Sequence, residues 1–399
     1  MERENSFPLP PQFNKNVKIR SIKQFLNYNR NNFVINTHKD SHYTENKSNW
    51  IKSIIPEYIK TNFRFLRDLY RVNIEALDSQ IMWLYDKLRF MFFCISYHCY
   101  FRYEIIISID NIGLVTSKFL NFLKKSEIYY WSLEIDTNKS NLFVYRLFEV
   151  LYTSCLSSTR EIIIQENSRL KVLSNHYSVD FNGRNIYFIP HSPINSKKFL
   201  NRNFFKQKFK FRENKKIILH AGWIHDAMCV DQLALVSRYW KNKYQLVLHE
   251  REKRSAEEPF IKHIHSLSGK RLKLSLDPVS FDNIDDVFSS ADIGIIAYDK
   301  RYGGGRENVF KASGKLGQYL KCGVPVIALN LPGYSELFSK YNCGLVFNHF
   351  GEIENCIDQI FSNYQFYRDG CFKCFEEEFD FSKYFNRLLL SISNHYKTN

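Results

Sequence analysis

The chain has 399 residues, of which 44% are hydrophobic and 16% aromatic, and its formal net charge is +15. This length exceeds one ordinary hydrophobic core and fits two domains of about 150–200 residues each. The apolar content excludes a wholly disordered chain. The basic excess favours anionic partners, namely a sugar diphosphate, a phospholipid surface or a nucleic acid, and does not choose among them.

Neither the start of the chain nor its cysteines indicate export. The start, MERENSFPLPPQ, is polar and proline-rich and has no secretory apolar region. The most apolar run, residues 90–101, is too short to span a bilayer and has Lys87, Arg89 and Arg102 at its flanks. The nine cysteines have no paired metal spacing, and their odd number argues against a disulfide scaffold. We expect a cytoplasmic protein, with a peripheral position on the inner face of the membrane as an option.

The first half of the chain, residues 1–194, alternates β-rich runs with helical patterns and predicts one Rossmann-like domain. Residues 39–62 are polar and lack a period, so they are predicted as a loop. Strands are predicted at 33–38, 104–110, 128–135, 160–167 and 185–190, and helices at 17–29, 73–100, 113–125, 141–157 and 168–176.

A basic segment follows at 195–215. Extended to residue 216, it carries nine basic residues and one acidic residue, Glu213, with aromatic residues between them. This composition is typical of a solvated linker. A contact with a membrane surface or with a nucleic acid is the alternative.

The second half, residues 216–378, predicts a second Rossmann-like domain. Its strands are continuous apolar runs, and the segment between the first two, 230–240, has helical periodicity. This pattern indicates a doubly wound parallel sheet covered on both faces. Strands are predicted at 216–222, 244–250, 271–276, 292–298, 324–329 and 344–347. Residues 379–399 predict a C-terminal helix that packs back toward the first domain.

Motifs of the second half, in their order, carry a family resemblance. The segment 312–337 holds a helix that ends in Cys322-Gly323, a strand at Pro325-Val326-Ile327, and a turn at Pro332-Gly333 with Glu336. Together with 289–298, and with 128–135, 162–173 and 186–193 in the first half, it resembles the GT-B glycosyltransferases of the family 4-like group. The resemblance runs from about residue 10 to the end. It implies an α/β fold with two domains facing a cleft, and sugar transfer from a nucleotide-diphosphate-sugar donor with retention at the anomeric carbon.

The resemblance places the donor site at the start of the helix after residue 312. Ser313, Gly314 and Lys315 are expected to open this helix, whose free N–H groups and positive end suit a diphosphate. Lys315 adds a cation. Gly222, after the first strand of this domain, would let the diphosphate lie against the turn, and its neighbour Trp223 is expected to pack between the domains.

The donor motif departs from the family at several positions. The second of the family's paired glutamates aligns with Gln318, whose amide can still bond a ribose diol, and the first aligns with Phe310. The arginine and lysine that usually follow the first strand are also absent, because Trp223 and Met228 lie there.

Other basic residues are candidates to replace that missing pair. They are Lys315, Lys311 and Arg306, the last beside the glycine run 303–305. This run predicts either a segment that closes over the phosphates or a flexible surface loop.

On the acceptor side, Glu134 is the candidate catalytic residue. The family's histidine–glutamate pair corresponds to Leu133 and Glu134, so only the glutamate remains to orient an acceptor hydroxyl or take its proton. Capping of the next helix is the alternative role. His191 and His220 lie at predicted strand ends facing the cleft, as structural or catalytic histidines. We expect no metal and no other cofactor, because a helix dipole and basic side chains neutralise a leaving diphosphate.

The start of the chain differs from the family pattern. Residues 10–26 resemble the loop and helix that normally follow the first strand, and only nine residues precede them. The first strand of the N-terminal sheet is therefore expected to be missing, with the loss of part of the acceptor side.

Three functions are compatible with these patterns. The first is an active glycosyltransferase that builds a polysaccharide, a glycolipid or another hydroxyl-bearing acceptor. The second is a degenerate GT-B protein that binds a nucleotide-sugar or acts as a scaffold. Nucleic-acid binding through 195–216 ranks last, since no recognised module accompanies it. Lys87, Arg89, Arg102 and the aromatic residues of 83–101 form either an anionic-membrane contact or part of a buried helix.

Overall fold

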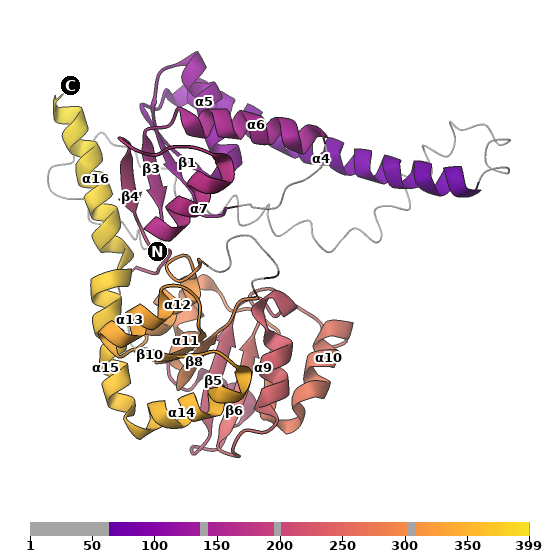
Figure 1. The fold of residues 1–399 in the computed structure, drawn as a ribbon, viewed down its shortest axis with the longest axis vertical. Coiled ribbons are helices and arrows are strands. Elements are labelled where there is room, and N and C mark those ends of the chain that lie inside the picture. The colour runs from indigo at the N-terminus through magenta and orange to yellow at the C-terminus, as the bar shows by residue number, and fades with distance from the viewer. Residues whose placement is uncertain (1–63, 136–142, 195–200, 300, 302–307, 399) are drawn as a thin grey trace, which may run out of the picture. The chain divides into compact units, whose positions relative to one another are not determined.

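The computed structural model describes residues 64–135, 143–194, 201–299, 301 and 308–398, with side chains from Met82 to Asn394. The chain divides into two compact units, Met1–Ile81 and Met82–Asn399. Of the first unit, only the start of helix α4 (Arg64–Phe101) is described. The second unit holds two parallel sheets with their helices (Figure 1). The strand predicted at 33–38, the helix at 17–29 and the question of a missing first strand lie outside the described residues.

The N-terminal lobe is built on strands β1 (Ile105–Ile109), β2 (Glu127–Trp131), β3 (Glu161–Ile164) and β4 (Asn185–Phe188), paired in that order. Helices α5 (Asp110–Leu123), α6 (Phe143–Ser157) and α7 (Asn167–Tyr177) connect them. Because each connection steps in the same direction, the right-handed crossover rule puts all three helices on one face. There Leu114, Tyr130 and Leu156 form a buried core.

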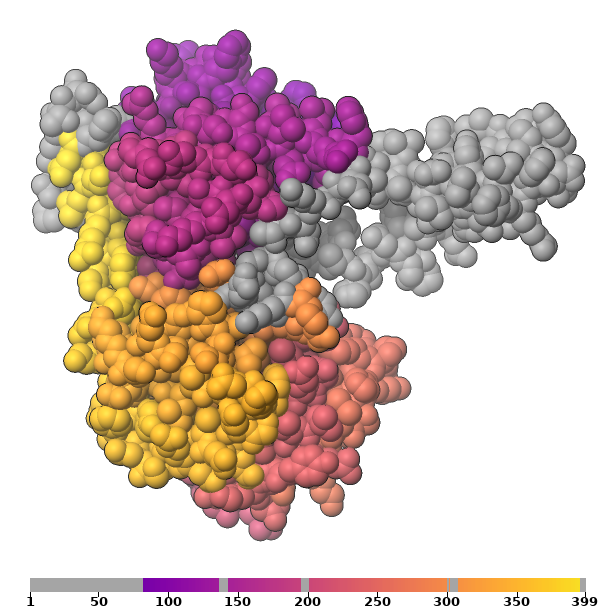
Figure 2. Space-filling model, viewed as in Figure 1, coloured from indigo at the N-terminus to yellow at the C-terminus, as the bar shows by residue number. Residues whose placement is uncertain are grey.

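The C-terminal helix α16 (Phe381–Thr398) covers the other face of this sheet. Its Leu388 and Ile392 share a buried cluster with Tyr129 and Ile163 of the strands. Figure 2 shows α16, in yellow, running along the N-terminal lobe. The described strands therefore wind in one direction only. A double winding would need strands beyond β1, and the segment predicted at 33–38 is not among the described residues.

The C-terminal lobe holds the doubly wound sheet that the apolar runs predicted. Its order is β10-β9-β8-β5-β6-β7, so the winding reverses between β8 and β5. The strands are β5 (Lys216–Ala221), β6 (Tyr244–His249), β7 (Leu272–Ser275), β8 (Ile293–Ile296), β9 (Val326–Leu329) and β10 (Gly344–Phe347). Every residue of β6 is buried, as expected for a parallel strand covered on both faces.

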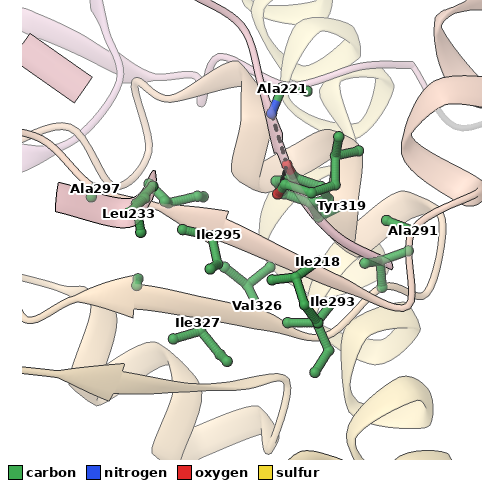
Figure 3. Close-up of a cluster of buried hydrophobic side chains, with 14 of the residues drawn as sticks. Ile218, Ala221, Leu233, Ala291, Ile293, Ile295, Ala297, Tyr319, Val326 and Ile327 are labelled. Atoms are coloured by element: carbon green, nitrogen blue, oxygen red, sulfur yellow. Dashed lines mark hydrogen bonds between the residues drawn. The ribbon is translucent and has the colours of Figure 1, made fainter. Parts of the chain in front are cut away.

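Helices and short turns cover both faces of the six-stranded sheet. They are α9 (Val230–Ser237), α10 (Pro259–Ser268), α11 (Ile284–Ser289), α12 (Gly314–Lys321), α13 (Tyr334–Tyr341), α14 (Ile353–Ser362) and α15 (Tyr364–Cys374), with short turns at Asp226–Met228, Gly269–Arg271, Phe281–Asn283 and Phe350–Glu352 and a π-helical turn at Phe375–Phe379. Figure 3 shows the centre of the core, where Ile218, Ile295 and Val326 lie in the same buried cluster as Tyr319 of α12.

Part of the predicted linker is folded against the C-terminal lobe. Residues Phe204–Phe209 form helix α8, and Phe205 is fully buried in the core of this lobe. Lys206 pairs with Glu213 at 2.8 Å, and Lys208 Nζ donates to Ser275 Oγ at 2.8 Å. Because Phe205 faces the core, it is not available to stack on bases, which removes one basis of the nucleic-acid hypothesis.

Candidate functional site

The start of α12 presents open hydrogen-bond donors. Ser313 is its N-cap residue, but its hydroxyl bonds Tyr298 Oη at 2.8 Å and caps no backbone N–H. Leu316 N donates to Ser313 O at 3.1 Å. For the N–H groups of Gly314 and Lys315, the structure gives no acceptor within the described part of the chain. A helix end of this kind favours an anion, since its dipole adds to the free N–H groups.

Lys315 extends from this helix end to the turn after β5. Its Nζ lies 3.5 Å from His220 Nε2 and 3.7 Å from Met228 Sδ. A Cβ at Gly222 would lie 2.9 Å from Lys315 Cε, and Gly222 has a φ of +124°. Glycine is therefore required there, both for the backbone conformation and for the lysine. Burial, assisted by nearby Arg251, lowers the pKa of Lys315 to about 7.

The turn after β5 is held by a buried carboxylate. Glu250 directly follows β6, is fully buried, and accepts the N–H groups of Ile224 at 2.9 Å and of Arg251 at 2.8 Å. Trp223 stacks on His225 with 3.9 Å between ring centroids, and Arg251 lies 5.7 Å over the Trp223 ring. Glu250 and Arg251 were missed in the sequence analysis. Their signal was their place at the carboxyl end of a strand that neighbours β5.

The loop after β4 touches the start of α12. His191 N donates to Lys311 O at 2.8 Å, and its ring Nδ1 lies 3.2 Å from Ala312 O. The same ring lies 3.6 Å from the position that a Cβ at Gly314 would take. Both histidines singled out in the sequence thus lie at this helix end, His191 beside Gly314 and His220 beside Lys315.

The departures from the family motif have structural consequences. Gln318 lies one turn after Gly314, and its buried side-chain oxygen has no hydrogen-bond partner among the residues that the structure describes. Phe310 packs against Gly333 of the Pro332-Gly333 turn. The position of the family's first glutamate is thus filled by a packed aromatic ring.

Of the substitute cations, only Lys315 has no carboxylate partner within the described residues. Lys311 Nζ is paired with Glu378 Oε2 at 2.9 Å. Burial opposes ionisation of Glu378, but bonds from Lys311 and Lys340 outweigh it and lower its pKa to about 2. Arg306 and the glycine run 303–305 lie outside the described residues.

On the acceptor side, Glu134 lies on a loop held from two directions. Asp110 Oδ1 accepts the N–H groups of Leu133 at 2.8 Å and Glu134 at 3.0 Å. The buried Arg169 donates to Leu133 O at 2.8 Å and to Asn308 O, in the C-terminal lobe, at 3.4 Å. The Glu134 side chain is exposed, and residues 136–142, which precede α6, lie outside the described part of the chain, so capping of that helix stays an alternative role.

Asp110 was not predicted as a site residue. It follows β1 directly, has a φ of +53°, and lines a cavity of about 140 Å³ together with Glu134 and Tyr152. Burial raises the pKa of its carboxyl group. A larger cavity of about 260 Å³ lies at the opposite, amino edge of this sheet, beside Glu127 and Glu161. No group of three or more potential metal ligands occurs within the residues that the structure describes.

Two parallel sheets with this connectivity and a returning C-terminal helix define the GT-B fold, and solved structures of that fold resemble the chain. Sucrose-phosphate synthase of Thermosynechococcus elongatus matches with a TM-score of 0.60 at 13% identity, over 78% of each chain. HepE of Anabaena, solved with UDP, matches with a TM-score of 0.57 at 12% identity, over 76% of this chain and 82% of HepE. A glycosyltransferase of Rickettsia africae matches with a TM-score of 0.57 at 15% identity, over 78% and 82%. No family model and no curated protein matches the chain.

Proposed function

We propose that this protein is a glycosyltransferase that takes a sugar from a nucleotide-diphosphate-sugar and passes it to a hydroxyl of a polysaccharide, a glycolipid or a similar acceptor. The fold supports this class of reaction, because HepE, a structural neighbour, was solved with UDP and with UDP-glucose. The expected outcome is retention at the anomeric carbon, without a bound metal.

The observation that carries the proposal is the place of Lys315. By the resemblance, Trp223 and Met228 lie about where the family's arginine and lysine would be, and Lys315 Nζ lies 3.7 Å from Met228 Sδ. The cation at this place is therefore carried by α12 and not by the turn after β5. With the N–H groups of Gly314 and Lys315 beside it, this cation supplies what a leaving diphosphate requires.

On the acceptor side, Glu134 is proposed to orient the attacking hydroxyl or take its proton. Its carboxylate is exposed and shares a cavity with Asp110, while its backbone is fixed by Asp110. The donor positions proposed from the fold are Ser313, Gly314, Lys315, Gly222, Trp223 and Gln318. Arg306 remains a candidate for the same role from the sequence.

A second function is favoured by Phe310. Because this ring packs on Gly333 where the family has a glutamate, the protein could bind a nucleotide-sugar, or act as a scaffold, without transferring it. Binding of a nucleotide-sugar without hydrolysis or transfer would support this alternative.

A thermal-shift screen of nucleotide-sugars tests the proposal, because a ligand that binds only the folded state raises the melting temperature. We expect UDP-glucose or another nucleoside-diphosphate sugar to raise it by several degrees, and free sugars to have no effect. Release of nucleoside diphosphate, measured with each hit, then separates the transferase from the binding protein. A screen without a single hit would contradict both.

We further propose that helices α4, α5 and α6 rest on an anionic membrane surface. Among the residues whose side chains the structure describes, 16 of the 23 exposed large apolar ones lie on these helices, and Arg89, Arg102, Lys124 and Lys125 are exposed beside them. None of the described helices has the length and hydropathy to cross a bilayer. Apolar side chains with basic neighbours suit an interfacial position. The sixteen are Met82, Leu84, Tyr85, Leu88, Phe92, Phe93, Tyr97, Tyr100, Phe101, Phe119, Phe122, Leu123, Phe143, Leu147, Val150 and Leu151.

Flotation with phosphatidylcholine vesicles, with and without phosphatidylglycerol, tests this contact. We expect the protein to float with the anionic vesicles, and the double variant Phe92→Ser, Phe122→Ser to lose most of this binding. Phe366→Ser, on α15, is the matched control and should float like the wild type. Wild-type protein that stays in the soluble fraction with both vesicles would contradict lipid docking.

A further inference from the structure

We propose that His220 is a positioning residue for Lys315: its Nε2 holds the amine beside the Gly222 turn, and the pair makes binding of a nucleoside-diphosphate sugar take up a proton. This inference rests on the proposed function, because the diphosphate is the anion that the amine would meet. It assigns a role to a histidine that the proposed function leaves without one.

The backbone around His220 is held against α12, the helix that carries Lys315. His220 is the fifth of the six residues of β5 and is fully buried. Its two neighbours are both tied to α12, since Tyr319 Oη donates to Leu219 O at 2.7 Å and accepts from Ala221 N at 3.2 Å. Tyr319 lies one helical turn after Lys315, so the same face of α12 that bonds β5 also carries the lysine. The docking of α12 on β5 thus brings Lys315 within reach of His220, and the Lys315 Nζ lies 3.5 Å from the His220 Nε2.

The charges around the amine leave His220 as its polar partner. Lys315 forms no ion pair with a carboxylate in the described part of the chain. From the end of β6, Arg251 repels the ammonium form and Glu250 attracts it, but Glu250 is already bonded to the N–H groups of Ile224 and Arg251. From beyond β8, the Tyr298 ring lies 5.2 Å from Nζ. The remaining neighbour of the amine, Met228, has no ionisable group.

The surroundings of the pair lower the pKa values of both side chains. Burial, with the charge of Lys315, lowers the pKa of His220 well below its usual value, so its ring is neutral at pH 7 and offers a lone pair to the amine. Burial lowers the pKa of Lys315 to about 7. The amine therefore exchanges between its neutral and ammonium forms near pH 7, where an ordinary lysine is fully charged.

A diphosphate bound beside the amine would favour its ammonium form. Binding should then take up most of a proton at pH 8 and little at pH 6, because a group of pKa about 7 is mostly neutral at the first pH and mostly charged at the second. Affinity should fall about tenfold from pH 6 to pH 8 for the same reason.

Titration calorimetry with UDP-glucose, in two buffers of different ionisation enthalpy at each pH, measures this uptake. UDP-glucose is suitable because its diphosphate is esterified at both ends and does not titrate between these pH values. The control is Lys315→Arg, whose guanidinium stays charged. It should bind without proton uptake and with an affinity that does not change from pH 6 to pH 8.

Two variants of His220 separate positioning from a structural role. His220→Gln keeps an acceptor atom for the amine and should retain proton uptake. His220→Leu removes it, so the midpoint of uptake should move to lower pH and the affinity at pH 7 should fall about tenfold. A purely structural role would change the melting temperature of both variants and leave the midpoint in place.

The amine can also be followed without a ligand. In protein labelled with ¹³C-lysine, the Cε resonance that is lost in Lys315→Arg should titrate near pH 7, and lower in His220→Leu. A Lys315 that titrates above pH 9, or UDP-glucose binding without proton uptake, would overturn the inference and leave the proposed function intact. If Lys315 titrates near pH 7, and lower in His220→Leu, but no nucleotide-sugar binds, the proposed function is overturned instead.

Discussion

Replacing Lys315 by methionine is expected to weaken UDP-glucose binding at pH 6.5 by about a hundredfold, while the protein stays folded. Hydrogen bonds to a charged group contribute about 1.5–3 kcal/mol each, which corresponds to about 10–150-fold in affinity. Methionine keeps the apolar stem beside Gly222 and removes only the cation. Calorimetry and nucleotide release, measured on both proteins, check the loss.

The stability of this variant has a predictable sign. The pKa of Lys315 is lowered in the folded state, so the unfolded chain binds more protons between about pH 7 and pH 10. The charged lysine therefore destabilises the fold below pH 7, and this cost is relieved as the pH rises through that window. Lys315→Met should be at least as stable as the wild type at pH 6.5, which is the usual signature of a residue kept for function.

A lysine on the same helix is the matched control. Lys321 ends α12 and pairs with Asp285 at 2.7 Å, away from the helix start. Lys321→Met should lower the melting temperature, because it leaves Asp285 without its partner, and should leave UDP-glucose affinity within a few fold. Unchanged affinity in Lys315→Met would remove the proposed phosphate role.

The C-terminal sheet was predictable because its strands are buried on both faces. The run predicted at 216–222 is strand β5 at 216–221, and 244–250 is β6 at 244–249. Leu246, for example, lies in a strand without a solvent-exposed face, so the apolar run around it is continuous and easy to recognise in the sequence. The start of α12 at Ser313 and Gly314 was expected from the resemblance, and in the structure the Ser313 hydroxyl bonds Tyr298 Oη and not a backbone N–H of the helix.

Long-range packing was not predictable in the same way. Lys315 and His220 are 95 positions apart, and only the docking of α12 on β5 brings them together. Phe205, in a segment that is basic along its whole length, gave no periodic signal for burial. Asp110 bonds the amides of a loop 23 and 24 positions away, which depends on the parallel register of β1 and β2.

Tyr319→Phe is expected to cost about 2–4 kcal/mol of stability, because two buried backbone groups would lose their partner. β5 pairs with β6 over its whole length but with β8 only at Ile218 and Leu219. The Tyr319 hydroxyl bonds Leu219 O and Ala221 N at the place where β5 and β8 separate (Figure 3). The hydroxyl thus supplies hydrogen bonds that a neighbouring strand would otherwise make to β5. Gly294 leaves room for the ring, since a Cβ there would lie 2.7 Å from it.

The same hydroxyl ties α12, which carries the proposed donor site, to β5, so its loss should also weaken UDP-glucose binding. Urea unfolding followed by circular dichroism measures the first effect, and calorimetry the second. Tyr341→Phe is the control, because its hydroxyl bonds Glu377 and Glu378, and Glu378 keeps Lys311 and Lys340 as donors. This control should lose at most about 1 kcal/mol. If Tyr319→Phe unfolds at the wild-type urea concentration, the hydroxyl does not hold β5 to α12. The placement of His220 against Lys315 would then depend on the apolar packing around Ile218 and Ile295 alone.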